Sequence, residues 1–198
     1  MQNKNTEPLV LIQNPNSTNY KHVARQVIQP LRESDQSFTV YNTKYPDTPD
    51  NIAHMVDHLS DDARVIVAAG DGTVEQVINA SIQGEKNLTV GVVPYGNFND
   101  IAFAHMRRSQ NVLDMLGEDV STREVNPLTI EVDGEHWIDA ASYASFGLTA
   151  IIAAGFRSQE TRDLLRPLPR HMQKAIRNVK SGVDYLSHAW TQKLPDFR

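Results

Sequence analysis

Apolar residues in the first half of the chain fall into four short runs, each followed by a stretch with helical periodicity. The runs cover residues 9–13, 37–41, 64–68 and 88–93. The third run is β-branched and uninterrupted, as in strands buried on both faces of a sheet. After the runs, apolar residues recur three or four positions apart over residues 20–31, 52–59, 74–82 and 101–105. Each of these stretches predicts a helix, and Thr48-Pro49 marks the start of the second.

Strands that alternate with helices predict an α/β fold with an open, mostly parallel sheet and helices on both faces. In such sheets the turns at the carboxyl ends of the strands meet on one rim, where ligands bind. Four polar or glycine-bearing turns fall there: Asn14-Pro15, Thr43, residues 70–73 and residues 96–100. We therefore expect residues 1–121 to form a ligand-binding α/β domain.

The pattern changes to strict alternation after residue 119. Leu128, Ile130 and Val132 are apolar at every second position, and Asp133-Gly134 is a hairpin turn signal. The pair Asp133 and Glu135 resembles a catalytic carboxylate pair, but an Asp-Gly turn between alternating strands is the favoured interpretation. Residues 122–198 are thus predicted to begin a second, antiparallel β domain that also carries helices.

A helical stripe of apolar residues lies near the end of the chain. Its members are Met172, Ile176, Val179, Val183, Leu186 and Trp190. The opposite face of the same predicted helix is basic, with Arg170, Lys174, Arg177 and Lys180. Core packing is the default role of the stripe, and the alternatives are an exposed groove or a homodimer contact.

The loop Gly70-Asp71-Gly72-Thr73 joins the third strand to its helix. Glycines permit positive φ and lack a Cβ, so backbone N–H groups can point at an anion lying against the positive end of the helix. The alternative is a plain tight turn in which Thr73 caps the helix. There is no Gly-x4-Gly-Lys-Ser/Thr motif, and Glu75 stands where the dinucleotide pattern has its third glycine. A phosphate bound at this loop would therefore be held by neither of these two common motifs.

Composition limits the classes of protein to consider. The chain has 198 residues, of which 40% are hydrophobic and 22% charged, as in soluble globular proteins. It has no cysteine, which excludes disulfides and thiolate chemistry, and its seven histidines show no metal-ligand spacing. The start is polar, without a signal-peptide core, and the uncharged run 140–156 is shorter than the about 20 residues of a spanning helix. A cytoplasmic location is expected.

Charge is distributed unevenly around a net charge of −5. Residues 151–198 carry nine Lys and Arg against four Asp and Glu, whereas residues 1–150 carry ten against twenty. A basic tail can serve an anionic membrane surface or nucleic acid, and a solvated helix face that balances an acidic neighbour is the plainer alternative. We expect no nucleic-acid partner and peripheral contact with the inner membrane face.

Four motifs together resemble the diacylglycerol kinase catalytic domain family, which includes bacterial lipid kinases and sphingosine kinases and is related to NAD kinases. The turn at residues 14–17 is similar to the family's Asn-Pro-x-Ser-Gly, and Thr43 matches a threonine that touches nucleotide in relatives. Residues 69–77 match Gly-Gly-Asp-Gly-Thr-x-Asn-Glu-Val, and residues 93–102 match the family's Pro-Leu-Gly-Thr-Gly-Asn-Asp-Phe-Ala loop. The resemblance runs over nearly the whole chain.

This chain departs from the family pattern at several positions. Ala69 replaces the first glycine of the signature and Glu75 replaces its asparagine, while Phe98 stands where a small residue is usual. Relatives also continue for roughly a hundred residues as a β-sandwich that carries an acidic general base and a magnesium site. That part would lie beyond Arg198, so this chain alone is not expected to show full activity.

The resemblance implies an ATP-dependent lipid kinase that uses Mg2+ and phosphorylates a hydroxyl of a diacylglycerol- or sphingoid-like lipid. The alternatives are a truncated or degenerate nucleotide-binding module without phosphotransfer and, third, an NAD kinase-like enzyme. Asp71 is the predicted catalytic and metal-binding residue. The predicted nucleotide-binding residues are Asn14, Pro15, Thr43, Ala69, Gly70, Asp71, Gly72, Thr73, Glu75, Gly96, Asn97, Asn99 and Asp100.

Overall fold

The computed structural model of the chain describes residues 9–34, 36–44, 48–97, 99–105, 111–116, 120–141, 167–169 and 172. The chain divides into two compact units, Met1–Tyr143 and Ala144–Arg198. The described residues belong almost entirely to the first unit. The predicted apolar stripe after Met172 and the basic face opposite it lie outside the described residues.

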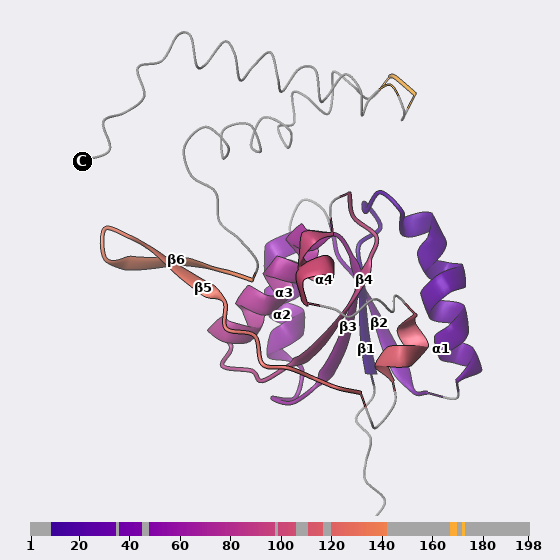
Figure 1. Ribbon diagram of the computed structural model, residues 1–198, viewed down its shortest axis with the longest axis horizontal. Coiled ribbons are helices and arrows are strands. Elements are labelled where there is room, and N and C mark those ends of the chain that lie inside the picture. The colour runs from indigo at the N-terminus through magenta and orange to yellow at the C-terminus, as the bar shows by residue number, and fades with distance from the viewer. Residues whose placement is uncertain are drawn as a thin grey trace, which may run out of the picture. The chain divides into compact units, whose positions relative to one another are not determined.

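Four parallel strands form the central sheet in the order β2-β1-β3-β4 (Figure 1). They are β1 Leu9–Gln13, β2 Phe38–Asn42, β3 Arg64–Ala69 and β4 Thr89–Pro94. The predicted α/β fold with a parallel sheet is confirmed, and β2 and β4 each begin and end one residue later than the sequence pattern predicted. β1 and β3 are the inner strands and are buried along nearly their whole length.

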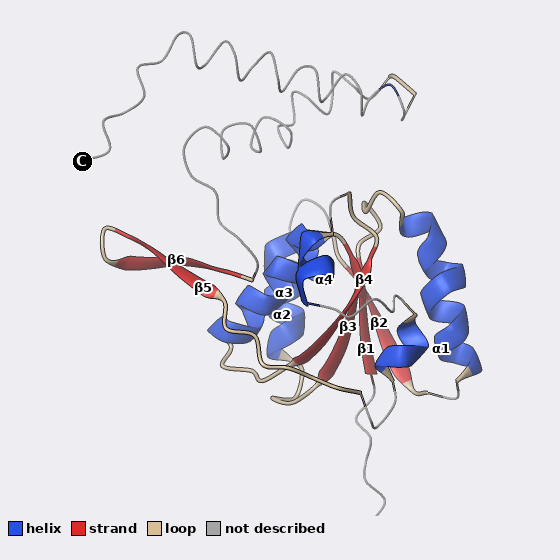
Figure 2. Cartoon of the chain, viewed as in Figure 1, coloured by secondary structure: helices blue, strands red, loops and turns tan. Residues whose placement is uncertain are grey.

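Helices cover both faces of the sheet (Figure 2). One face carries α2 Thr48–Asp57, α3 Asp71–Gln83 and α4 Asp100–His105. The other carries η1 Tyr20–His22, η2 Ala24–Ile28, α1 Gln29–Glu33 and η3 Val112–Met115. Alternate residues of β1 serve the two cores, with Val10 and Ile12 in the first cluster and Leu9 and Leu11 in the second.

The helix predicted over residues 20–31 is divided into three segments, of which η2 is a π-helical turn. Pro30 lies in the first turn of α1 and has no N–H to donate. Its ring would also clash with the carbonyl four residues earlier in a regular helix. The wider turn avoids this clash, and Gln29 N–H donates to the carbonyl of Ala24, five residues back. Val23, Val27 and Leu31 still face the core, as the periodicity predicted.

The chain leaves β1 and β3 toward opposite faces of the sheet. After β1 it enters η1, η2 and α1, and after β3 it enters α3 on the other face. Because β1 and β3 are hydrogen-bonded neighbours, their two outgoing loops diverge at the carboxyl ends of the strands. Open α/β sheets bind ligands at this topological switch point.

A two-stranded antiparallel sheet, β5 Leu128–Val132 and β6 Glu135–Ala140, follows the parallel sheet in the chain. Asp133 and Gly134 join the strands with φ of 54° and 83°. Positive φ at both central residues is the geometry of a tight hairpin turn. The turn interpretation of Asp133 and Glu135 is therefore confirmed. The hairpin is grouped with the first compact unit.

Candidate functional site

Helix α3 begins at the switch point with an N-terminus that no side chain of the described residues caps. Gly70 is the N-cap residue, and its carbonyl accepts the N–H of Thr73 at 3.0 Å. The first amides of a helix, here those of Asp71 and Gly72, have no partner within the helix. The alternative in which Thr73 caps α3 is wrong, because Thr73 lies inside the helix with its side chain buried.

At Gly70 there is no room for a Cβ, at Gly72 the space is open, and neither glycine has a positive φ. Gly70 has a φ of −93°, and among the described residues the only glycine with positive φ is Gly134, so neither glycine of the loop uses the positive φ that its residue type permits. A Cβ on Gly70 would lie 2.9 Å from Gly96 Cα, and one on Gly96 would lie 2.5 Å from Gly70 Cα. A Cβ on Gly72 would meet nothing within 4 Å.

Hydrogen bonds join the loops that follow β1, β3 and β4. Asn14 Nδ2 donates to Thr73 Oγ1 at 3.0 Å. Asn19 N–H donates to the Tyr95 carbonyl at 3.1 Å, and Thr18 Oγ1 donates to Asn97 Oδ1 at 2.8 Å. The structure thus brings three of the four predicted turns into direct contact. Sequence reasoning missed Asn19 and Tyr95, because backbone groups make much of their contribution and no motif marks them.

Asn99 closes the loop between β4 and α4. Its Oδ1 accepts the N–H of Gly96 at 2.8 Å, and its Nδ2 donates to the Gly96 carbonyl at 3.2 Å. Its φ of 59° lies in the left-handed region, which asparagine tolerates better than most residues. Asp100 is the first residue of α4, Asn97 is exposed, and Phe98 lies outside the described residues.

Asp71 is the only carboxylate at the start of α3, and it already has a structural task. Its Oδ1 accepts the N–H of Ile101 at 3.0 Å and so caps α4. Among the residues that the structure describes, no group of three or more His, Cys, Asp or Glu side chains is placed to hold a metal ion. A Mg2+ at this loop would therefore take one oxygen of Asp71 and complete its shell with ligand phosphates and water, as Mg2+ commonly does.

Three of the predicted residues occupy the rim without presenting a side chain at the start of α3. Thr43 N–H donates to the Gln13 carbonyl at 3.0 Å, but its side chain is buried. Within the described part of the chain, Thr43 Oγ1 and Gln13 Oε1 are buried without hydrogen-bond partners. Pro15 is exposed in its turn, and Ala69 is enclosed in the core as the last residue of β3.

Glu75 reaches the hairpin. Its Oε1 accepts the N–H of Ala141 at 2.9 Å. Burial raises the pKa of the Glu75 carboxyl, the Ala141 N–H acts in the opposite direction, and the charges of Asp71 and Asp139 raise it further. On Asp139, burial acts to raise the pKa, but hydrogen bonds from Thr129 and His136 and the charge of His136 hold it below its ordinary value.

A Glu75→Gln variant is expected to gain stability relative to wild type as pH rises. The folded chain raises the pKa of Glu75, so its contribution to the free energy of unfolding is present below the ordinary pKa and is lost as pH rises through the raised value. Glutamine does not titrate and still offers Oε1 to Ala141. Thermal unfolding at about pH 4 and about pH 7 should show a more positive Tm difference at the higher pH. Equal differences would contradict this expectation.

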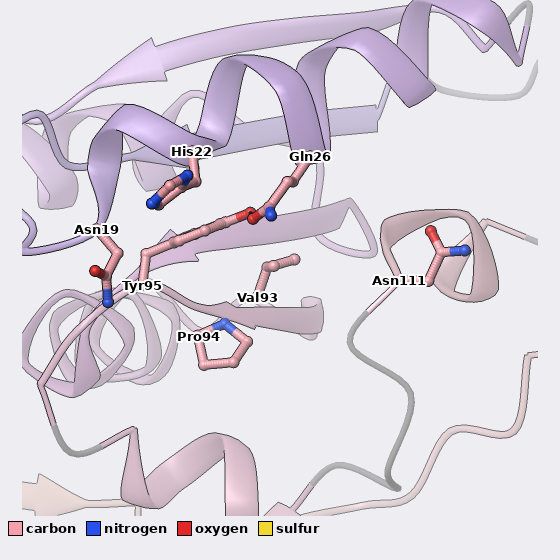
Figure 3. A pocket seen from close by; sticks show the side chains of 7 residues that line it. All are labelled: Asn19, His22, Gln26, Val93, Pro94, Tyr95 and Asn111. Carbon is pink, nitrogen blue, oxygen red and sulfur yellow. The ribbon is translucent and has the colours of Figure 1, made fainter.

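A cavity of about 560 Å³ lies beside the contact between Asn19 and Tyr95, on the face covered by η1 and η2 (Figure 3). Its lining residues are Asn19, His22, Gln26, Val93, Pro94, Tyr95 and Asn111. Tyr95 Oη donates to Gln26 Oε1 at 3.0 Å, and burial raises the pKa of the Tyr95 hydroxyl. The cavity contains none of the predicted site residues, so the candidate phosphate site is the rim at α3.

Helices of the described residues are all too short or too polar to cross a membrane.

Comparisons with known proteins agree with this architecture. The profile of the family described as Diacylglycerol kinase catalytic domain matches residues 8–130. Over 122 residues the chain is 28% identical to a protein named Diacylglycerol kinase from Bacillus subtilis (strain 168), a match that spans 61% of this chain and 39% of that protein. The residues matched by the family profile include β1 to β4 and all the predicted site residues.

Solved structures show a similar fold at lower identity. A candidate diacylglycerol kinase from Bacillus anthracis str. Sterne has a TM-score of 0.50 and 20% identity, covering 69% of this chain and 50% of that one. A diacylglycerol kinase from the same strain has a TM-score of 0.49 and 20% identity, covering 66% and 48%. The chain spans half or less of the length of these relatives. Since the family profile matches more than half of its residues, the chain belongs to the diacylglycerol kinase catalytic domain family.

Proposed function

We propose that this chain binds ATP at the N-terminus of α3 and transfers the γ-phosphate to a hydroxyl of a diacylglycerol- or sphingoid-like lipid. The observation that carries the proposal is the uncapped start of α3 at the switch point, with open space over Gly72. Membership of a kinase family supports phosphotransfer. The basic residues of 151–198 would hold the chain near an anionic membrane surface.

Phosphoryl transfer depends on positioning and charge neutralisation rather than on covalent chemistry by the protein. The N–H groups of Asp71 and Gly72 and the positive end of α3 would bind phosphate oxygens. Bound Mg2+ would neutralise phosphate charge. Ile101 N–H already uses Asp71 Oδ1, and Mg2+ and the proton of the acceptor hydroxyl would compete for the remaining charge of the same carboxylate. We assign it to Mg2+, and the general base then comes from another group.

The second candidate is a nucleotide-binding module that holds ATP without transferring phosphate. It is favoured by Glu75, one turn from the start of α3, whose negative charge in the ionised state would oppose the charge neutralisation that phosphoryl transfer needs. An NAD kinase-like activity is the third candidate and has less support than the lipid kinase, because the family profile that matches is the diacylglycerol kinase one.

Transfer of labelled γ-phosphate from Mg-ATP to dioleoylglycerol or to a sphingoid base, each in vesicles with and without anionic lipid, tests the proposal. We expect labelled lipid from wild type and none from Asp71→Asn. The asparagine Oδ1 can still accept from Ile101, so this variant keeps the cap of α4 while losing the charge. ATP binding by wild type without label on any lipid, on NAD or in released phosphate would support the module instead.

A further inference from the structure

The end of β6 is held by side chains where a neighbouring strand would otherwise lie. Asp139, Ala140 and Ala141 are all buried, so their backbone groups need partners. Asp139 N–H donates to Asn79 Oδ1 at 3.0 Å, and the Asp139 carbonyl accepts from Asn79 Nδ2 at 2.7 Å. The Asn79 carboxamide thus makes the pair of hydrogen bonds that an opposing strand residue makes in an antiparallel ladder.

Two further side chains, Glu75 of α3 and His105 of α4, hold the backbone of Ala141 in the same way. Ala141 N–H donates to Glu75 Oε1 at 2.9 Å, and the Ala141 carbonyl lies 2.8 Å from His105 Nε2. Glu75 and Asn79 are four residues apart, about 6 Å along a helix axis. Residues 139 and 141 are two apart, about 6.6 Å along a strand. The two spacings match, and we call Glu75, Asn79 and His105 the edge clasp.

Neighbouring hydrogen bonds fix the donor and acceptor roles within the edge clasp. Arg123 Nη2, which can only donate, lies 2.6 Å from His105 Nδ1. His105 Nδ1 is therefore an acceptor, and Nε2 carries the hydrogen that it donates to Ala141. Asn79 Nδ2 also donates to the carbonyl of Glu75 at 2.9 Å, which orients the carboxamide toward Asp139.

The edge clasp belongs to the two helices that begin at the candidate phosphate site. Glu75 and Asn79 are on α3, which starts at Asp71, and His105 is the last residue of α4. At the other end of these helices, Asp71 Oδ1 accepts the N–H of Ile101. The starts of α3 and α4 are thus joined to each other directly, and the side chains further along both helices are joined through the end of β6.

We propose that the edge clasp positions α3 and α4 for phosphate binding, so that docking of the hairpin and binding of the nucleotide strengthen each other. The proposal rests on the proposed function, because it needs phosphates at the start of α3. A ligand that contacts both the start of α3 and the loop before α4 favours one arrangement of the two helices. The edge clasp favours the same arrangement, and such coupling is reciprocal.

The test uses the full chain and two measurements. The first is the Kd of Mg-ATP, measured by titration calorimetry, for wild type, Asn79→Ala and His105→Ala. Neither substituted residue lies at the start of α3. Gln83→Ala is the matched control, because Gln83 is exposed at the opposite end of α3 from Asp71. The second is amide hydrogen exchange of a peptide that contains residues 139 and 141, with and without Mg-ATP. This measurement is made on wild type, so it does not depend on a variant that folds.

We expect Mg-ATP to slow exchange of this peptide in wild type by at least about 5-fold and either clasp variant to weaken binding by a similar factor, with Gln83→Ala unchanged. A clasp with a structural role only would lower Tm and leave Kd within about twofold, which would overturn the proposal. Unchanged exchange in wild type that does bind Mg-ATP would also overturn it. Wild type that binds no Mg-ATP would refute the proposed function itself, and the coupling with it.

Discussion

Gly72→Val is expected to abolish binding of Mg-ATP while leaving the fold intact. A Cβ at this position meets no atom within 4 Å, the residue is exposed, and its φ is not positive, so the folded chain can accept the side chain. The added methyl groups would fill the space in which phosphates are proposed to lie. Wild type should gain about 5–10 °C in Tm at an Mg-ATP concentration of about 100 times Kd, and the variant should gain none.

The matched control is Gln83→Val, which places the same β-branched residue on an exposed position at the other end of α3. This variant should keep the full Tm gain with Mg-ATP. Without nucleotide, Gly72→Val should melt at or slightly above the wild-type temperature, because replacing glycine at a compatible φ restricts the unfolded chain. A normal Mg-ATP response in Gly72→Val would place the nucleotide away from the start of α3.

Gly96→Ala is expected to lower the free energy of unfolding by about 3 kcal/mol, near the upper end of the range for overpacking. The added Cβ would lie 2.5 Å from Gly70 Cα and 3.0 Å from Asn99 Oδ1. Since the first of these atoms is backbone, one of the two loops must move. Denaturant unfolding should show a lower midpoint, with a similar slope if the denatured state is unchanged.

Gly91→Ala provides the comparison for this variant, because Gly91 lies in β4, the strand that leads into the same loop. Its added Cβ would lie 3.1 Å from Met115 Sδ, a flexible side chain that can shift, so a smaller loss is expected. Gly72→Ala, in open space, should cost almost nothing. Equal losses in Gly96→Ala and Gly91→Ala would show that the contact between Gly70 and Gly96 does not limit packing of the site.

Periodicity predicted the four parallel strands and their helices, and the inner strands β1 and β3 are indeed buried. The hairpin was predicted from alternation together with its Asp133-Gly134 turn, and most of its residues are exposed. Periodicity did not predict the π-helical turn η2, where the proline at residue 30 disturbs a pattern that otherwise reads as one helix. Nor did it predict η3, which contributes one buried side chain, Val112, to the second core cluster. Such short elements carry too few residues to show a period.

The site was predictable in position but less so in detail. Strand order explains why the loops at residues 14, 70 and 96 meet, since their place at the carboxyl ends of neighbouring strands follows from the fold class. The roles of single residues depend on partners that are distant in the sequence. Glu75 bonds to a residue 66 positions away, and the need for glycine at position 70 comes from Gly96 rather than from its own φ.

The contact between Gly70 and Gly96 also limits how this protein can evolve. When two side chains crowd each other, a larger residue at one position can be offset by a smaller one at the other. Glycine is already the smallest residue, so neither position can compensate for growth of the other. In functional descendants of this sequence we therefore expect both glycines to be retained together, while Gly72, whose surroundings are open, would be retained only as long as its ligand is.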